Sequence, residues 1–253
     1  DYGVLTPFNH FIAVNASLEL LKAVLKLNPK AVETGDASDT FPLHLACQFA
    51  DLETIIFIAN QYPEALWIAS SECGLPLHCA LWRQEQGGTG IEILKTVLEM
   101  CPAAMKLEDA EDRTALELAL KRDVPLNLLQ LLVNYIPGDM QEFKLEEFPE
   151  EDEKAWDLNH KQIEILSGIF PQLTRLTVKV KHWTRAGLNS LFESLHNFSS
   201  LKTLHLDIPT DIHIRHWNGE ALELLQQYLG HQETLETLVL CMYDRTLEHT
   251  GIK

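Results

Sequence analysis

Histidine and cysteine, two residue types that bind zinc, lie close together at two places in the chain. His44 precedes Cys47 by three residues, and Cys73 is followed by His78 and Cys79. Zinc sites built from these residues usually contain a C-x-x-C or an H-x-x-x-H pair, and neither group contains one. The spacing therefore argues against a zinc site, and we predict no metal and no cofactor.

A glycine-rich segment, Gly87-Gly-Thr-Gly90, offers a second possible chemistry, the binding of phosphate by backbone N–H groups. A phosphate-binding loop of that kind follows a buried strand and continues into Lys-Ser or Lys-Thr, and neither feature is present. We interpret the segment as an inserted loop. The chain also lacks a G-x-S-x-G, an H-E-x-x-H and the kinase motifs, so the sequence predicts that the protein is not an enzyme.

The charge of the chain restricts its partners. Its 253 residues include 37 acidic and 20 basic ones, a formal net charge of -17. An excess of negative charge opposes binding to nucleic acids and to anionic membranes, so we expect a protein partner with a neutral or basic surface. No apolar run approaches the roughly 20 residues of a membrane-spanning helix, so direct membrane insertion is not expected.

The cysteines predict a reducing compartment. The chain has five of them, an odd number, scattered without a paired framework. Structural disulfides are therefore not expected, and the cytoplasm or the nucleus is the predicted location. An organelle stays open, because the sequence begins at Asp1 without a Met and a targeting segment would not be seen.

The acidic residues are distributed unevenly. Residues 1–141 carry 19 acidic and 9 basic residues, 142–157 carry 8 and 2, and 158–253 carry 10 and 9. The middle segment is highly charged and contains Pro149, so we predict a solvated linker between two domains, 1–141 and 158–253. A docking strip for a basic partner is the alternative interpretation of this segment.

A repeated pattern organises residues 1–141. Pro42-Leu-His-Leu-Ala46, Pro76-Leu-His-Cys-Ala80 and Ala115-Leu-Glu-Leu-Ala119 are spaced by 34 and 39 residues. A second landmark, an apolar helical stretch that ends before a proline, recurs at Pro29, Pro63, Pro102 and Pro137. These patterns predict about four helix-turn-helix repeats, with a proline at the first helical position and a small alanine where neighbouring helices approach.

These residues resemble the T-P-L-H-x-A core of ankyrin repeats, and the Tyr62-Pro-Glu-Ala-Leu66 ending is similar to ankyrin-repeat proteins of diatoms and related algae. The resemblance implies that the histidine of each core bonds to backbone near the hairpin of the adjacent repeat. Asp39, Cys73 and Asp112 stand where the family usually has glycine. Because Asp adopts left-handed backbone more readily than Cys does, we expect an irregular hairpin around Cys73.

A different repeat occupies the C-terminal part. Leu173-Thr-Arg-Leu-Thr-Val178, Leu201-Lys-Thr-Leu-His-Leu206 and Leu235-Glu-Thr-Leu-Val-Leu240 share the form L-x-x-L-x-apolar, which predicts short strands. Trp183 and Trp217 each precede a predicted helix and are interpreted as hydrophobic staples. This segment resembles leucine-rich repeats of the ribonuclease-inhibitor type. The predicted fold is an α-rich repeat solenoid, an ankyrin stack, followed by a short α/β leucine-rich-repeat segment.

Repeat proteins bind partners through surfaces that repeat the same position, so the candidate binding residues follow from these two resemblances. The ankyrin resemblance implies hairpin tips and first helices; the leucine-rich resemblance implies strand residues that alternate with buried leucines. The candidates are Asp36, Asp39, Glu72, Asp109 and Asp112 at the tips, Trp82 and Arg83 on a first helix, and Arg175, Lys179, His205 and Asp207 on the strands.

The predicted function is that of a non-catalytic protein-protein interaction scaffold or adaptor. A structural or assembly subunit of a large stable multiprotein complex is the alternative. For Trp82 two roles stay open, since the indole would either anchor a partner or pack under the inserted loop.

Overall fold

The computed structural model describes residues 6–83, 88–122, 124–136, 138, 140–146, 160–166, 170–179, 185–209, 223, 225–227, 229–230 and 234–243. The chain divides into two compact units, Asp1–Pro137 and Gly138–Lys253. The first is helical and the second contains a parallel sheet, so the chain is helix-rich with a small α/β part.

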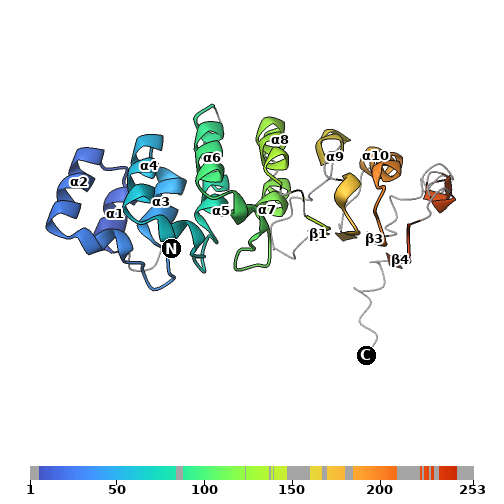
Figure 1. Cartoon of the computed structure of the whole chain (residues 1–253), viewed down its shortest axis with the longest axis horizontal. Helices are drawn as coiled ribbons and strands as arrows, with labels where there is room; N and C mark the ends of the chain where they lie inside the picture. The colour runs from blue at the N-terminus through green and yellow to red at the C-terminus, as the bar shows by residue number, and fades with distance from the viewer. Residues whose placement is uncertain are drawn as a thin grey trace, which may run out of the picture. The chain divides into compact units, whose positions relative to one another are not determined.

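Helices follow one another in pairs in the first unit (Figure 1). The pairs are α1 (Pro7–Ala13) with α2 (Leu18–Leu27), α3 (Pro42–Phe49) with α4 (Leu52–Gln61), α5 (Pro76–Leu81) with α6 (Gly88–Met100), and α7 (Ala115–Lys121) with α8 (Leu126–Asn134). Short 3-10 helices follow the first three pairs: η1 (Pro29–Glu33), η2 (Pro63–Trp67) and η3 (Pro102–Lys106). The helix pairs predicted from the sequence are confirmed.

Polar caps and prolines set the ends of these helices. The side-chain oxygen of Asp51 accepts a hydrogen bond from the backbone N–H of Thr54 at 2.8 Å, which caps the start of α4. Thr6 and Ser17 cap α1 and α2 in the same way. Pro63 and its counterparts cannot continue the preceding helix, so the chain turns there into a 3-10 helix.

The first helix of each pair packs against the first helix of the next, because α1 contacts α3, α3 contacts α5, and α5 contacts α7. Ala46, Ala80 and Ala119 are buried in these helices, and their small side chains permit a close approach of the backbones. The second helices α4, α6 and α8 contact one another in the same order. One buried apolar layer therefore runs through the unit.

The second unit contains four parallel strands in chain order: β1 (Glu142–Glu146), β2 (Arg175–Lys179), β3 (Thr203–Pro209) and β4 (Thr237–Tyr243). Between strands lie α9 (His160–Leu166), η4 (Phe170–Gln172), α10 (Arg185–Ser194) and η5 (Leu195–Asn197), with α9 packed on α10. Leu176, Leu204 and Leu206 are buried on one side of the sheet, as the L-x-x-L-x-apolar pattern predicts.

Shared backbone carbonyls fix the register of this sheet. The oxygen of Gln141 accepts hydrogen bonds from the N–H groups of Thr174 and Arg175, at 2.8 and 3.0 Å. The oxygen of Thr174 accepts likewise from Lys202 and Thr203. The oxygen of Lys202 accepts from Glu236, which precedes β4, and from Thr237, the first residue of β4. Each strand is thus anchored to the preceding one just before the ladder begins.

The predicted linker is wrong at its start. Residues 142–146 form β1, which pairs with β2, and Phe143 is buried. The alternation of charged and apolar residues in Glu142-Phe-Lys-Leu-Glu146 is the period of a half-buried strand, and the high charge of the segment concealed it. Residues 147–157, together with Trp183 and Trp217, lie outside the described residues.

The predicted insert is also shorter than expected. Gly88-Thr-Gly90 belongs to the first turn of α6, where we expected a loop. Glycine in the middle of a helix lowers the stability of the helix, but it is tolerated at a helix start.

None of the helices in the described ranges has the length and apolar character required to cross a lipid bilayer.

The close packing of first helices generates a prediction. We expect Ala80→Leu to lower the free energy of unfolding by about 1–3 kcal/mol, because the added carbons would overpack this buried position of α5. A urea titration of the full chain measures this change. Ala103→Leu, at an exposed position in η3, is the matched control and should change stability by less than about 0.5 kcal/mol. Equal effects of the two substitutions would contradict the packing described here.

Candidate binding surface at the hairpins

Three hairpins connect the helix pairs, Asp36–Thr40, Ser70–Gly74 and Asp109–Arg113. In the first, a carboxylate oxygen of Asp36 accepts hydrogen bonds from the backbone N–H groups of Ser38 and Thr40, both at 2.9 Å. In the third, Asp109 accepts from Glu111 and Arg113 in the same way, at 2.9 and 3.0 Å. These two carboxylates hold the turn of their own hairpin.

The hairpins differ in where the backbone becomes left-handed. Asp39 and Asp112 have φ values of 55° and 57°, at the position that is glycine in the family resembled. In the second hairpin Cys73 stands at this position, and the left-handed residue is Gly74, with φ 72°. The irregularity predicted for this hairpin is confirmed, and it consists of a shift of the left-handed residue by one position.

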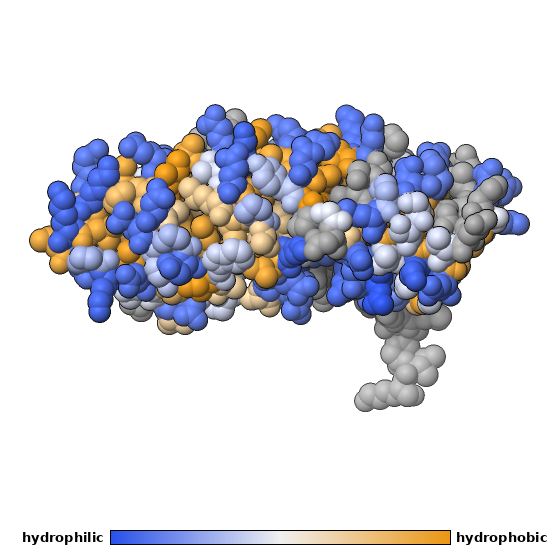
Figure 2. All heavy atoms as spheres, viewed as in Figure 1, coloured by the Kyte–Doolittle hydropathy of each residue, from blue (hydrophilic) through white to orange (hydrophobic). Residues whose placement is uncertain are grey.

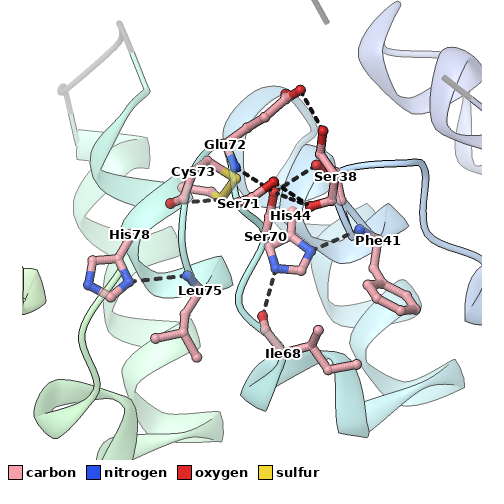
Figure 3. The surroundings of a disulfide bond; sticks show 12 residues. Ser38, Phe41, His44, Ile68, Ser70, Ser71, Glu72, Cys73, Leu75 and His78 are labelled. Atoms are coloured by element: carbon pink, nitrogen blue, oxygen red, sulfur yellow. Dashed lines mark hydrogen bonds between the residues drawn. A yellow bond between two sulfur atoms is a disulfide. The ribbon is translucent and has the colours of Figure 1, made fainter. Parts of the chain in front are cut away.

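A network of serine and threonine side chains joins the first hairpin to the second (Figure 3). The backbone N–H of Ser71 donates to the carbonyl oxygen of Ser38 at 3.0 Å, and the hydroxyl of Ser38 donates to Glu72 at 2.9 Å. Below them the hydroxyl groups of Thr40 and Ser70 are hydrogen-bonded at 2.7 Å and buried. The two hairpins are therefore held side by side.

Two buried histidines each link their own first helix to the backbone near the next hairpin. His44 Nδ1 accepts from the backbone N–H of Phe41 at 3.0 Å, so its Nε2 carries the proton and donates to the oxygen of Ile68 at 2.8 Å (Figure 3). His78 bonds likewise to Leu75 and to the oxygen of Arg113, both at 3.2 Å. The backbone bonding implied for these histidines is confirmed.

Burial sets the ionisation of both imidazoles. Removal from water lowers the pKa of His44 and lowers the pKa of His78 to about 4, although hydrogen bonds to backbone act in the opposite direction. Both side chains are fully buried. They are therefore neutral near pH 7, as their pattern of one accepting and one donating nitrogen requires.

A buried ion pair supports the third hairpin. Nε and Nη2 of Arg113 donate to one carboxylate oxygen of Asp109, at 2.9 and 2.8 Å, and both side chains are buried. Burial alone would raise the pKa of the Asp109 carboxyl, but the hydrogen bonds from Arg113 and the backbone outweigh it and lower that pKa. Gly74 packs directly on Asp109, so the second and third hairpins are in contact.

The structure pairs Cys73 with Cys79 in a disulfide, so the expectation that the chain contains none is wrong (Figure 3). The hairpin turns back onto the start of α5 and brings the two Cα atoms to 5.6 Å, within the range of disulfides. A spacing of six residues carries no such signal by itself. The bond joins the tip of the second hairpin to its own helix.

The structure divides the predicted tip residues into two groups. Asp39, Glu72 and Asp112 are exposed, at hairpin tips as predicted. Asp36 is half-buried and Asp109 is 8% exposed, and their carboxylates accept hydrogen bonds inside the hairpins, so these two residues serve the turns that they open.

The two first-helix candidates are engaged within the protein. Nη1 of Arg83 donates to the carbonyl oxygens of Cys47 and Ala50, at 3.1 and 2.9 Å, and so caps the end of α3. Trp82 lies under the guanidinium of Arg122, a contact that no sequence pattern predicts. Arg83 therefore has a role within the protein, at the end of a first helix.

The strand candidates lie on the side of the sheet opposite to the buried leucines. Arg175 is exposed and forms an ion pair with Glu142 at 3.6 Å, while Lys179 and His205 are half-buried. His205 Nε2 lies 3.8 Å from the thiol sulfur of Cys241 on the next strand. In the register of the sheet, Lys179 pairs with Asp207, whose side chain lies outside the described residues.

Apolar side chains also reach the surface. Trp67, at the end of η2, is 55% exposed, and Leu107 follows the corresponding segment η3. On the face drawn in Figure 2, hydrophobic residues lie between hydrophilic ones.

Within the described residues no group of three or more His, Cys, Asp or Glu side chains has a geometry that would hold a metal ion.

No protein-family model matches the chain, and no curated protein is significantly similar to it.

The left-handed conformation of Gly74 generates a prediction. We expect Gly74→Ala to reduce the free energy of unfolding by about 2 kcal/mol or more, because a Cβ atom would lie 2.6 Å from the Cβ of Asp109 and the backbone φ is positive. Gly138→Ala, where a Cβ meets nothing within 4 Å, is the control and should change stability by less than about 0.5 kcal/mol. Chemical denaturation measures both; a neutral Gly74→Ala would contradict the hairpin geometry.

The buried imidazole of His78 predicts a pH dependence of stability. Its pKa falls from 6.5 in the unfolded chain to about 4 in the folded protein, so between these values the unfolded state binds more protons. Stability therefore falls as the pH decreases from 6.5 to 4, with a contribution of about 1.4 kcal/mol per pH unit from this residue.

Denaturation curves at a series of pH values test this contribution. In His78→Gln the decrease between pH 6.5 and 4 should be shallower by that amount, whereas above pH 7 both proteins should show the same slope. Equal slopes below pH 6.5 would show that His78 does not stay neutral on folding.

Proposed function

We propose that this chain is a non-catalytic protein-protein interaction scaffold or adaptor. The observation that carries the proposal is the presentation of Asp39, Glu72 and Asp112 at the tips of successive hairpins, which are fastened to one another by hydrogen bonds and packing. Such a surface is fixed before a partner arrives, so little conformational entropy is lost on binding.

We further propose that the first unit is an ankyrin-repeat array and that the second is a leucine-rich-repeat segment starting at β1. The recurrence of hairpin, first helix and second helix supports the former, as does left-handed backbone at Asp39 and Asp112. Parallel strands in chain order, with helices between them and buried leucines, support the latter. Repeat arrays of both kinds present extended binding surfaces.

The use of titratable side chains in the first unit supports a role without catalysis. His44 and His78 are buried and bonded to backbone, and Asp109 is saturated by Arg113 and by two N–H groups. Burial raises the pKa of the Cys47 thiol to about 12, which makes it a poor nucleophile near pH 7. These groups serve the architecture.

The charge of the exposed tips specifies the partner that we propose. The three carboxylates recur at one side of the array in a chain whose net charge is -17. A basic protein surface would be attracted over long range, and the rate of association would depend on salt.

A second function is favoured by the edge of the sheet. Leu238 and Leu240 on β4 are 37% and 39% exposed, whereas Leu204 and Leu206, their register partners on β3, are fully buried. An exposed apolar strand edge is commonly covered by another polypeptide. This observation favours a structural subunit of a stable multiprotein complex, and we retain it as the alternative.

Binding by the hairpin tips predicts the effect of neutralising them. Affinity purification from a native extract would isolate the partner, and stopped-flow mixing with that partner would give the association rate. We expect the triple variant Asp39→Asn, Glu72→Gln, Asp112→Asn to associate about tenfold more slowly at physiological ionic strength and to depend less on salt. Asn tolerates the left-handed backbone at both Asp positions, so the hairpins keep their shape.

Glu92→Gln, on the exposed side of α6, is the matched control and should associate at the wild-type rate. Equal rates and equal salt dependence for the triple variant and the wild type would refute binding through the tips. Size-exclusion chromatography of the native extract separates the two functions: an adaptor elutes largely at the size of the single chain, and a resident subunit elutes only in a large complex.

A further inference from the structure

Trp82 and Arg122 form a stacked pair at the ends of two neighbouring first helices. Trp82 is the C-cap residue of α5 and Arg122 is that of α7, and these two helices are in contact. The central carbon of the Arg122 guanidinium lies 4.1 Å from the centre of the Trp82 ring, so a cation–π interaction holds the side chain in place.

Comparison with Arg83 shows what Arg122 lacks. The two arginines occupy the same place in successive repeats, seven residues after Pro76 and after Ala115. Arg83 donates to two backbone carbonyls at the end of the preceding first helix, α3. Arg122 lies on Trp82 instead, and its Nε is buried without a hydrogen-bond partner, as is the indole nitrogen of Trp82.

Two buried donors without acceptors are unfavourable, and the electrostatic surroundings add to this cost. Burial, together with the positive charge of Arg113, lowers the pKa of Arg122. Arg113 is itself neutralised by Asp109 and Glu111, whereas Arg122 has no carboxylate partner in the described structure. The Arg122 side chain is only half-buried, so a negatively charged acceptor from outside can approach its guanidinium and offset the repulsion from Arg113.

We propose that the Trp82–Arg122 pair binds a carboxylate, supplied by an Asp or Glu side chain of a protein partner. The guanidinium edge is a planar fork that matches the two oxygens of a carboxylate, and stacking on an aromatic ring orients it in advance. A single negative charge is balanced by one guanidinium, whereas a phosphate dianion would be repelled more strongly by residues 1–141, with 19 acidic and 9 basic residues.

This site complements the acidic hairpin tips. The hairpins precede the first helices and the stacked pair ends them, so the two lie at opposite ends of helices about 10 Å long. A partner bound across α5 and α7 would present basic groups to the tips and an acidic residue to Arg122. Only the source of the carboxylate rests on the proposed scaffold function; the binding of the group itself does not.

The indole N–H resonance of Trp82 in the full chain tests the proposal. It is assigned in a ¹H–¹⁵N spectrum by its absence from Trp82→Phe. Three probes are titrated at constant ionic strength: the blocked tripeptide Ala-Glu-Ala, its neutral counterpart Ala-Gln-Ala, and inorganic phosphate. We expect a saturating shift with Ala-Glu-Ala and no saturation with Ala-Gln-Ala or phosphate.

Variants assign the effect to the arginine. Arg122→Gln should weaken binding of Ala-Glu-Ala at least tenfold, and Arg122→Lys, which keeps the charge but loses the fork, should weaken it by a smaller factor. Lys95→Gln, at an exposed lysine of α6, is the control and should bind as the wild type does. Thermal melts establish that each variant is folded.

Three results would overturn the proposal: no saturation with Ala-Glu-Ala, saturation with phosphate alone, or equal binding by folded Arg122→Gln. These results leave the scaffold function standing, because that function is tested at the hairpin tips. Conversely, carboxylate binding without any effect of the tip variants would retain the site and refute binding through the tips.

Discussion

The arrangement of the first unit depends on one polar side chain in each of α1, α3 and α5, the third residue of the helix. Asn9, His44 and His78 occupy this position, and each reaches a backbone carbonyl of the following repeat, at distances of 2.8, 2.8 and 3.2 Å. The side chains are buried, so an unmade bond would leave a polar group without water. The hairpin of one repeat is thereby positioned by the helix of the one before it, and the exposed tips inherit their spacing from these bonds.

Most of the helices could be predicted because local and long-range requirements agree. Pro42 and Pro76 start helices, prolines 63 and 102 end them, and the apolar period of the intervening stretches identifies the face that packs. Strand β1 could not be predicted in this way. Its five residues carry three charges, and only the burial of Phe143 beside β2 shows that the alternation of residue types has structural meaning.

The candidate site was predictable in position but not in role. Four aspartates at the hairpins look equivalent in the sequence, yet Asp36 and Asp109 open their turns and bond to N–H groups two and four residues later, whereas Asp39 and Asp112 lie at the left-handed position and face solvent. Contacts between residues far apart in sequence, such as that of Trp82 with Arg122, arise only when α5 and α7 pack. No spacing rule encodes them.

The shared carbonyls of the sheet have a consequence for how this part of the chain tolerates change. Gln141, Thr174 and Lys202 each fix the next strand by two hydrogen bonds to a single oxygen, although the segments between them differ in length. Register is therefore independent of the number of residues in the crossover. Insertions and deletions between strands alter only what lies beside the sheet, which allows the length of each crossover to diversify during evolution while the order of the strands stays constant.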